Sequence, residues 1–410
     1  MPGPGPRRVV VTGMGVVSSI GTGIAEFAEG LRAGRSGTGP VTAFDTAGFP
    51  SGIACEVRGF EPERWVRTVP LERLGRAGGM AVAAARMAVD DARARLGDLR
   101  GRRGLVAIGT TCGESQDMDA LAVTEVAEGA ERMDPRLARR VPAHLLALSV
   151  AHELRLSNVD AYAIGTACAA GNYAIGEGFD AVRTGQADFA LCGGSDAFNR
   201  LLFAGFHRLG LIARDACRPF DSDRSGTLLG EGAGVLLLES LDGALVRNAP
   251  IYTEVLGYGL NCDGRHPVAP TRSSVAECMR LALDDAGIKP HEVDLICAHG
   301  TGTAVNDATE CGAIHDIYGE RTPRVVGVKS MLGHTLGAAS ALGAIASSLA
   351  ITHRFIPPTI NHRTTDPECA VDCVPNRAIE ADLRVVQNNG LAFGGDNAVV
   401  LFGRYQETNR

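Results

Sequence analysis

The chain of 410 residues is 45% hydrophobic and carries a formal net charge of -7. That much apolar material supports a large buried core, arranged as two domains or as one duplicated unit. The acidic balance, with a sequence pI near 5.8, argues against nucleic acid or an anionic membrane as the main partner.

The eleven cysteines include no Cys-x-x-Cys pair, so the sequence indicates neither a disulfide framework nor a zinc site of the usual pattern. We therefore expect no metal and a reducing, cytoplasmic setting. The first six residues lack the apolar segment of a signal peptide. The small-residue run at 333–352 contains His334 and several hydroxyls, which predicts a buried helix rather than a membrane span.

Residues 7–15 predict a buried strand that runs into the glycine turn Gly13-Met14-Gly15. Such a turn is typical of dinucleotide-binding folds. Here the third glycine of the fingerprint is missing, and no acidic residue closes a following strand at the expected distance. The sequence therefore disfavours a dinucleotide site.

Strands and helices alternate through the first half of the chain. Further strands are predicted at 105–108, 189–193 and 235–238, and helices at 23–33, 71–96, 116–132, 142–154 and 168–184. The helix at 71–96 carries Arg73, Arg76 and Arg86, a pattern typical of a solvated face.

The same alternation restarts after a boundary at 242–249. Strands are predicted at 252–260, 293–298, 325–328, 383–386 and 398–402, with helices at 273–286, 307–318 and 336–352. This order predicts an α/β fold with sheets covered by helices on both faces. Two similar halves, residues 1–248 and 249–410, suggest a duplication.

Cys168 lies where an apolar run gives way to small residues and a helical pattern begins, in Gly165-Thr166-Ala167-Cys168-Ala169. A helix N-terminus offers unpaired N–H groups and partial positive charge, which favour the nucleophilic thiolate. Most free cysteines are buried structural thiols, so this role requires partners elsewhere in the chain.

Two histidines occupy the same kind of position, each at the end of an apolar strand and followed by small residues. They are His299 in His299-Gly300-Thr301-Gly302-Thr303 and His334 in Leu332-Gly333-His334-Thr335. Strand ends are where sites assemble in α/β folds. We expect both imidazoles to converge on Cys168.

These motifs resemble those of the elongating, decarboxylating β-ketoacyl-[acyl-carrier-protein] synthases of the thiolase-like superfamily, over nearly the whole chain. The matching motifs are Thr166-Ala167-Cys168, His299 to Thr303, Asn306-Asp307-x-x-Glu310 and Lys329-x-x-x-Gly333-His334. The resemblance implies a thiolase-like fold, a duplicated five-layer αβαβα arrangement with two mixed sheets.

The resemblance also implies a two-step reaction. Cys168 accepts an acyl group from the phosphopantetheine of acyl carrier protein, and a malonyl carrier then loses CO2 and extends the chain by two carbons. His299 and His334, as neutral Nε2–H donors, are suited to stabilising the developing oxyanion. By similarity, Lys329 and Glu310 form a charged pair that orients His334 and its loop.

Further roles follow only from the resemblance. The backbone N–H groups of Cys168 and Phe393 form the expected oxyanion hole. The remaining assignments are Thr301 and Thr303 for the pantetheine arm, Ile108, Phe203 and Leu391 for the acyl pocket, and Arg67, Arg73, Arg76 and Arg208 for docking an acidic carrier protein.

One loop departs from the family pattern Phe-Gly-Phe-Gly-Gly. Here it is Leu391-Ala392-Phe393-Gly394-Gly395-Asp396. Alanine at 392 narrows the φ range of a loop that gates the acyl pocket in the family, and Asp396 adds a charge. We hypothesise that these changes alter which acyl chains are accepted and point to a specialised polyketide-type synthase at least as much as to housekeeping fatty-acid synthesis.

Two other functions are consistent with the fold. A non-catalytic chain-length-determining partner usually lacks the nucleophilic cysteine, which is present here, and a coenzyme A-dependent thiolase carries a second cysteine, which is missing from residues 393–396. We expect a homodimer, with a heterodimer with a chain-length partner as the alternative, and no permanently bound cofactor.

Overall fold

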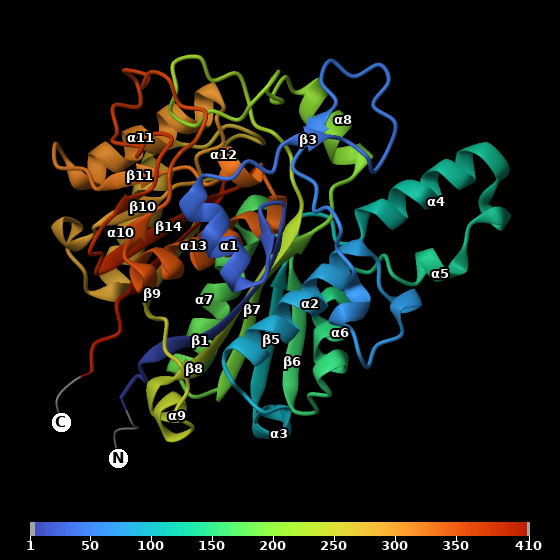
Figure 1. The fold of residues 1–410 in the computed structure, drawn as a ribbon, viewed down its shortest axis with the longest axis horizontal. Coiled ribbons are helices and arrows are strands. Elements are labelled where there is room, and N and C mark those ends of the chain that lie inside the picture. Colours follow the sequence, from blue (N-terminus) through green and yellow to red (C-terminus); the bar gives the residue numbers. More distant parts are fainter. Residues whose placement is uncertain (1–4, 408–410) are drawn as a thin grey trace.

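A computed structural model describes residues 5–407 (Figure 1). The first half contains strands β1 (Val9–Ser18), β2 (Gly21–Thr22), β3 (Gly39–Pro40), β4 (Ile53–Ala54), β5 (Gly104–Gly109), β6 (Val159–Ile164), β7 (Phe189–Asp196) and β8 (Gly232–Ser240). Its helices are α1 (Ile24–Ala33), α2 (Arg76–Asp91), α3 (Leu96–Leu99), α4 (Ser115–Glu128), α5 (Pro135–Ala138), α6 (Leu145–Leu154), α7 (Ala170–Arg183), α8 (Arg200–Arg208) and α9 (Leu241–Val246).

The second half contains β9 (Thr253–Cys262), β10 (Leu295–Cys297), β11 (Arg324–Val326), β12 (Phe355–Ile356), β13 (Ile379–Glu380), β14 (Val385–Leu391) and β15 (Asp396–Gly403). Its helices are α10 (Arg272–Ala286), α11 (Ala304–Tyr318), α12 (Lys329–Leu332) and α13 (Ala339–His353). The sequence-based boundary at residue 248 falls just after α9.

The main strands of the two halves follow the same order. In the first half the sheet runs β6-β5-β7-β8-β1, and in the second it runs β11-β10-β14-β15-β9. In each half the first three of these strands are parallel and the last two pair antiparallel. This repeated topology is the structural counterpart of the duplication suggested by the sequence.

The layers match the predicted αβαβα arrangement. Helices α2 and α6 cover the outer face of the first sheet, α10 and α11 cover the second, and α7 and α13 pack together between the sheets. The two mixed sheets also meet, because Val9, Val10 and Val11 of β1 pair with β9 and join both into one hydrogen-bonded ladder.

Small residues allow the two central helices to pack closely. A Cβ atom on Gly171 of α7 would lie 2.6 Å from the backbone nitrogen of Ala341 in α13. The helical stretch Leu336–His353 is long and apolar enough to cross a membrane, but 89% of it is buried inside the protein. It is a core helix, as its hydroxyl-rich sequence predicted.

The predicted helix at 71–96 is wrong in extent, since α2 spans only Arg76–Asp91 and Leu71–Arg73 form a separate 3-10 turn. The prediction of a solvated arginine face also fails at Arg86, which is 4% exposed and paired with buried Glu153 of α6. Glu153 additionally accepts backbone N–H groups from residues 67–69. This partner lies too far along the chain for a helical pattern to reveal it.

The segment that contains α4 and α5 projects from the body of the protein, at the right in Figure 1. Its helix α4 exposes 67% of Val123 and 89% of Val126. Only Ser115 and Leu121 of this helix are buried. The segment therefore contributes little to the core of its own chain.

Removing the charge of Glu153 tests the buried ion pair. Glu153→Gln leaves the Arg86 cation without its counter-charge, and we expect unfolding free energy to fall by about 3 kcal/mol. Urea unfolding at fixed protein concentration measures the change. Unchanged stability would contradict the assignment, whereas kcat for any reaction at Cys168 should stay the same because Glu153 does not contact that site.

Candidate active site

Cys168 lies in a sharp turn between β6 and α7. Residues Ala167–Ala169 form one 3-10 turn ahead of the helix, and Ala167 has a left-handed backbone with φ of 45°. A non-glycine residue in this region stores strain. The thiol is 4% exposed at the inner end of a cavity, as expected for a residue at this strand-to-helix turn.

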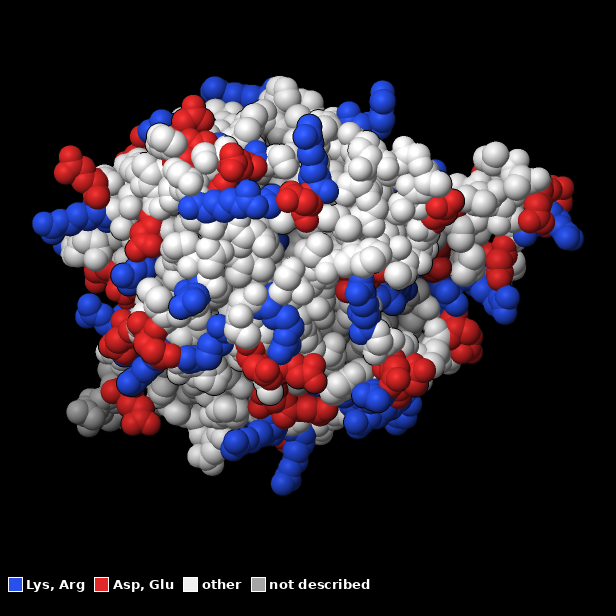
Figure 2. Space-filling view, turned by 45° about the horizontal axis from the view of Figure 1, so that its top comes forward, with Lys and Arg blue, Asp and Glu red and all other residues white. Residues whose placement is uncertain are grey.

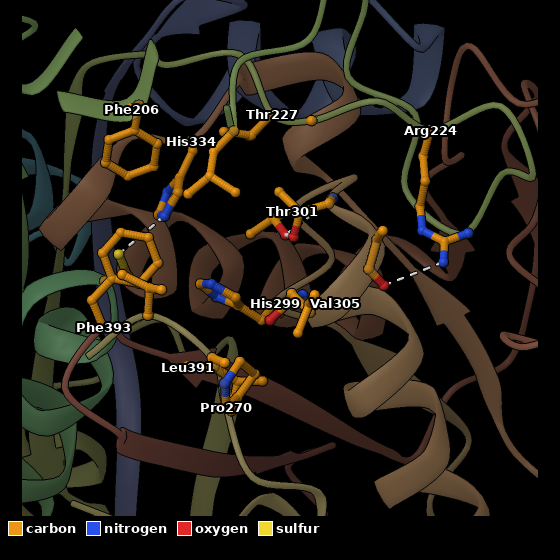
Figure 3. Close-up of a pocket in the computed structure, with 18 of the residues that line it drawn as sticks. Phe206, Arg224, Thr227, Pro270, His299, Thr301, Val305, His334, Leu391 and Phe393 are labelled. Carbon is orange, nitrogen blue, oxygen red and sulfur yellow. Dashed lines mark hydrogen bonds between the residues drawn. The ribbon is translucent and has the colours of Figure 1, made fainter. Parts of the chain in front are cut away.

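The imidazole of His334 faces this thiol, as the dashed contact in Figure 3 shows. His334 Nε2 lies 3.0 Å from Cys168 Sγ. On the other side of the ring, Nδ1 accepts the backbone N–H of Leu336 at 3.2 Å. An accepting Nδ1 leaves the proton on Nε2, so this ring presents an N–H group to the sulfur.

His299 lies at the carboxyl end of β10 and faces the same cavity. Its ring centroid is 5.4 Å from that of His334, with the planes at 86°. Lys329 Nζ donates to the His299 carbonyl oxygen and lies 3.4 Å from Nδ1. Because an ammonium can only donate, this contact also leaves the ring proton on Nε2.

Lys329 is a buried cation beside both rings. Its own pKa is lowered by burial, while Glu310 acts to raise it. Burial and the Lys329 charge together hold the pKa of His299 and of His334 well below the ordinary value of an imidazole. Both rings are therefore neutral near pH 7.

Glu310 on α11 fixes the backbone that carries His299. Its carboxylate accepts the N–H groups of His299 at 2.7 Å and Gly300 at 2.8 Å, and the Asn389 amide at 2.9 Å. The contacts correct one expectation: Glu310 and Lys329 both hold His299 rather than His334. The reason is geometric, since Glu310 in the middle of α11 and Lys329 at the start of α12 both reach the backbone that follows β10.

The surroundings of the Cys168 thiol oppose its ionisation. Burial raises the pKa of Cys168 to about 12, and the Asp196 carboxylate adds to this effect, while Lys329 and the backbone N–H groups of Phe393 and Cys168 act to lower the pKa. These two N–H groups point at the sulfur from different loops. The same pair can bind an oxyanion that forms on a thioester carbonyl beside the sulfur.

The cavity in front of Cys168 has a volume of about 270 Å³. His299 and His334 line it together with Thr301, Thr303, Leu391 and Phe393, as predicted for a shared site. The Thr301 and Thr303 hydroxyls lie 2.8 Å apart. Phe393 stacks on Phe206 of α8, with ring centroids 5.4 Å apart.

Two predicted pocket residues do not line this cavity. Ile108 is fully buried in β5, within the core under α2. Phe203 is fully buried behind the wall, where it packs against Phe198 and Phe49. Phe206, one helical turn beyond Phe203, lines the cavity instead, and the i,i+3 spacing of these aromatics was the signal for it.

The four predicted docking arginines differ in their surroundings. Arg67, Arg73 and Arg208 are exposed. Arg76 instead pairs with buried Glu231 and donates to the Val57 carbonyl, so its charge is largely neutralised within the fold. Among residues 5–407, no group of three or more His, Cys, Asp or Glu side chains is arranged to hold a metal ion.

The comparisons with known proteins agree with this geometry. The family model "Beta-ketoacyl synthase, N-terminal domain" matches residues 6–244, and "Beta-ketoacyl synthase, C-terminal domain" matches residues 252–363. The 3-oxoacyl-[acyl-carrier-protein] synthase 2 of Synechocystis sp. is 35% identical, with 98% of this chain and 99% of the relative covered. The Staphylococcus aureus enzyme of the same name is 36% identical over the same shares.

Solved structures extend the comparison. The ishigamide ketosynthase/chain length factor is 60% identical, with a TM-score of 0.97 over 98% of this chain and 100% of that one. A type II PKS acyl-carrier protein in complex with its ketosynthase bound to the hexaketide gives 32% identity and a TM-score of 0.89 over the same shares. The thiolase-like ketosynthase fold is thereby confirmed, and the chain belongs to the beta-ketoacyl synthase family of condensing acyltransferases.

Proposed function

We propose that this chain is a β-ketoacyl-[acyl-carrier-protein] synthase that condenses a Cys168-bound acyl group with a malonyl carrier in type II polyketide assembly. The observation that carries the proposal is the pair of neutral imidazoles that face one buried thiol across one cavity. We infer the class of reaction from the family to which the chain belongs, and the individual steps from the residues at the site.

In the first step the Cys168 sulfur attacks the thioester carbonyl of an acyl carrier. The negative charge that develops on the carbonyl oxygen is bound by the N–H groups of Cys168 and Phe393. The carrier thiol leaves and takes the proton that Cys168 loses. The acyl group is then held as a thioester on the enzyme, and the carrier can be exchanged.

In the second step a malonyl carrier enters the same cavity and its carboxylate leaves as CO2. The electron pair passes into an enolate whose oxygen accepts hydrogen bonds from His299 Nε2–H and His334 Nε2–H. The enolate carbon attacks the acyl thioester, and a carbon–carbon bond forms as the carbon–sulfur bond to Cys168 breaks. The Cys168 thiolate leaves and takes up one proton from water, which balances the loss of the carboxylate as CO2. Thr301 and Thr303 are the proposed contacts of the pantetheine arm.

The two alternatives are less well supported. A non-catalytic chain-length partner needs no nucleophile, whereas here the Cys168 sulfur faces two donating backbone N–H groups and an imidazole. A thiolase needs a second acid–base thiol in the cavity. Cys168 is the single cysteine among the residues that line it.

The loop at 391–396 supports a specialised acyl substrate. Gly394 N–H donates to the Pro267 carbonyl, and Ala392 N–H donates to the Asp396 carbonyl. These two hydrogen bonds fix the conformation of the loop that carries Leu391 and Phe393, which line the cavity. The similarity to the ketosynthase of a type II PKS complex, at 32% identity and a TM-score of 0.89, likewise supports a role in polyketide assembly.

The proposed partners are an acyl carrier protein and a second synthase-like subunit. Strand β6 is an edge of the sheet and its residues are partly exposed, which suits pairing with an identical chain or a chain-length partner. The proposed location is the cytoplasm, and the proposed enzyme keeps no bound cofactor because its substrates arrive on the carrier.

A basic groove offers a surface for an acidic carrier. Arg73 lines it together with Arg136, Arg139, Arg140 and Arg155, and the one acidic residue in the lining is Glu72. Arg136 pairs with Asp134 and Arg140 with Asp117, so Arg73, Arg139 and Arg155 are the main source of the positive charge. Figure 2 shows blue side chains gathered beneath the projecting α4–α5 segment. We assign the docking role to this groove and to exposed Arg67 and Arg208. Arg76 is excluded because it pairs with buried Glu231.

Replacing the three site residues tests the reaction. Cys168→Ala should abolish acyl-enzyme formation while malonyl carrier is still decarboxylated. His299→Ala and His334→Ala should each reduce decarboxylation by about a hundredfold or more, since each removes one oxyanion donor. Intact-mass spectrometry and CO2 release measure the two activities, and full condensation by Cys168→Ala would exclude the proposal.

Substrate choice is tested with a panel of acyl carriers. We expect oxo- or polyene-acyl groups to load onto Cys168 at least tenfold faster than saturated chains, as read by intact mass. Ala392→Gly, which restores the backbone freedom of the family loop, should reduce this preference. Equal loading of saturated C6 to C14 chains would rule out the specialised role.

Charge reversal tests the groove. Arg73→Glu should raise KM for acyl carrier protein by about tenfold at low salt, with kcat nearly unchanged, because the groove acts on association. Arg58→Glu, at a residue that does not line this groove, serves as the control. A KM that does not respond to Arg73→Glu would remove the groove from the docking surface.

A further inference from the structure

The turn that carries Cys168 has a counterpart in the second half of the chain. Thr166-Ala167-Cys168-Ala169 leads into α7, and Thr335-Leu336-Gly337-Ala338 leads into α13. Both pass through one 3-10 turn, Ala167–Ala169 and Leu336–Ala338. The left-handed residue stands at the same place in each, with φ of 45° at Ala167 and 55° at Leu336. Gly337 therefore corresponds to Cys168.

The backbone of the second turn already binds an anion from within the protein, the carboxylate of Asp196. The Gly337 N–H, which corresponds to an N–H that points at the Cys168 sulfur, donates to Asp196 Oδ2 at 2.6 Å. A Cβ atom on Gly337 would lie 2.7 Å from that oxygen and 2.5 Å from Thr110 Cα. No nucleophilic side chain fits at this position.

Asp196 ends β7 and is fully buried. Besides Gly337, its carboxylate accepts Thr110 Oγ1 at 2.7 Å and the N–H groups of Thr111 and Cys112 at 2.7 and 3.3 Å. Three of the four partners are backbone N–H groups, which cannot accept a proton in return. Burial raises the pKa of Asp196, and these four hydrogen bonds act against that rise because each is made to the charged form. The donor set therefore fits a carboxylate.

The turn held by Asp196 is the one that sets the tautomer of His334. Leu336, next to Gly337, donates its N–H to His334 Nδ1. A strained left-handed residue persists only where its surroundings hold it. The four bonds to Asp196 supply that restraint, because they tie the turn to the ends of β5 and β7.

We propose that Asp196 is a positioning residue for decarboxylation: it occupies the second turn as an internal anion and thereby keeps the Leu336 N–H on His334 Nδ1 and the His334 proton on Nε2. The inference rests on the proposed function and adds a residue that touches neither substrate nor reacting atoms. It also explains why one turn of a duplicated pair carries a nucleophile and the other cannot.

Asp196→Asn in the full-length enzyme tests this role. The NH2 group of asparagine cannot accept a hydrogen bond, so at least one of the four donors loses its acceptor. We expect kcat for decarboxylation of malonyl carrier protein to fall about tenfold or more, with KM within about twofold. Loss of the Leu336 contact also frees Nδ1 to take a proton. Cys168, His299 and Lys329 face the ring, and burial and the Lys329 charge still hold the pKa of His334 low. The acid limb of the pH profile should therefore move up from its wild-type position but stay below the ordinary imidazole value.

Glu153→Gln is the matched control, since Glu153 is likewise buried and accepts three backbone N–H groups away from the cavity. It should lose stability but keep kcat and the acid limb of the wild type. Asp196→Asn with kcat within twofold of the wild type, or with an unmoved acid limb, would overturn the proposal.

Thr110→Val keeps the test decisive if Asp196→Asn does not fold. It removes one donor to the carboxylate with little change of shape, and we expect kcat to fall severalfold; an unchanged kcat would overturn the proposal. A wild-type enzyme that does not decarboxylate malonyl carrier would instead contradict the proposed function, so the two failures are distinguishable.

Discussion

The buried cation of Lys329 determines the charge state of the site around Cys168. An ammonium in a dry interior is costly unless it is paired and hydrogen-bonded, and here Glu310 and the His299 carbonyl compensate for that cost. Burial already disfavours a positive charge on His299 and His334, and the field of Lys329 adds to this effect, so both rings stay neutral and act as donors. Neutral donors suit an enolate, because they stabilise the developing charge without transferring a proton to it.

Duplication explains how distant residues meet at this point. Both halves place a strand-to-helix turn at the same edge, and the central helices α7 and α13 pack face to face between the sheets. Cys168 and His334 are therefore in contact although they lie 166 positions apart in the chain. The first turn presents a nucleophile, and in the second turn the Asp196 carboxylate takes the place of a ligand.

The alternation of strands and helices, the duplication and the set Cys168, His299 and His334 could be predicted from the sequence, because each depends on local periodicity or on short motifs. Contacts across the fold could not. The helical pattern gave no sign that Arg86 meets Glu153, or that Lys329 holds His299 rather than His334. Ile108 does not line the cavity in front of Cys168, because an apolar residue at a strand end can face the core as readily as the cavity.

The central claim is that both imidazoles are neutral and carry their proton on Nε2. Nitrogen-15 NMR of the histidine-labelled enzyme at pH 7, with His299→Ala and His334→Ala used to assign the two rings, measures this directly. The account predicts one protonated Nε2 and one unprotonated Nδ1 for each ring. An imidazolium at either position, or a proton on Nδ1 of His334, would contradict it.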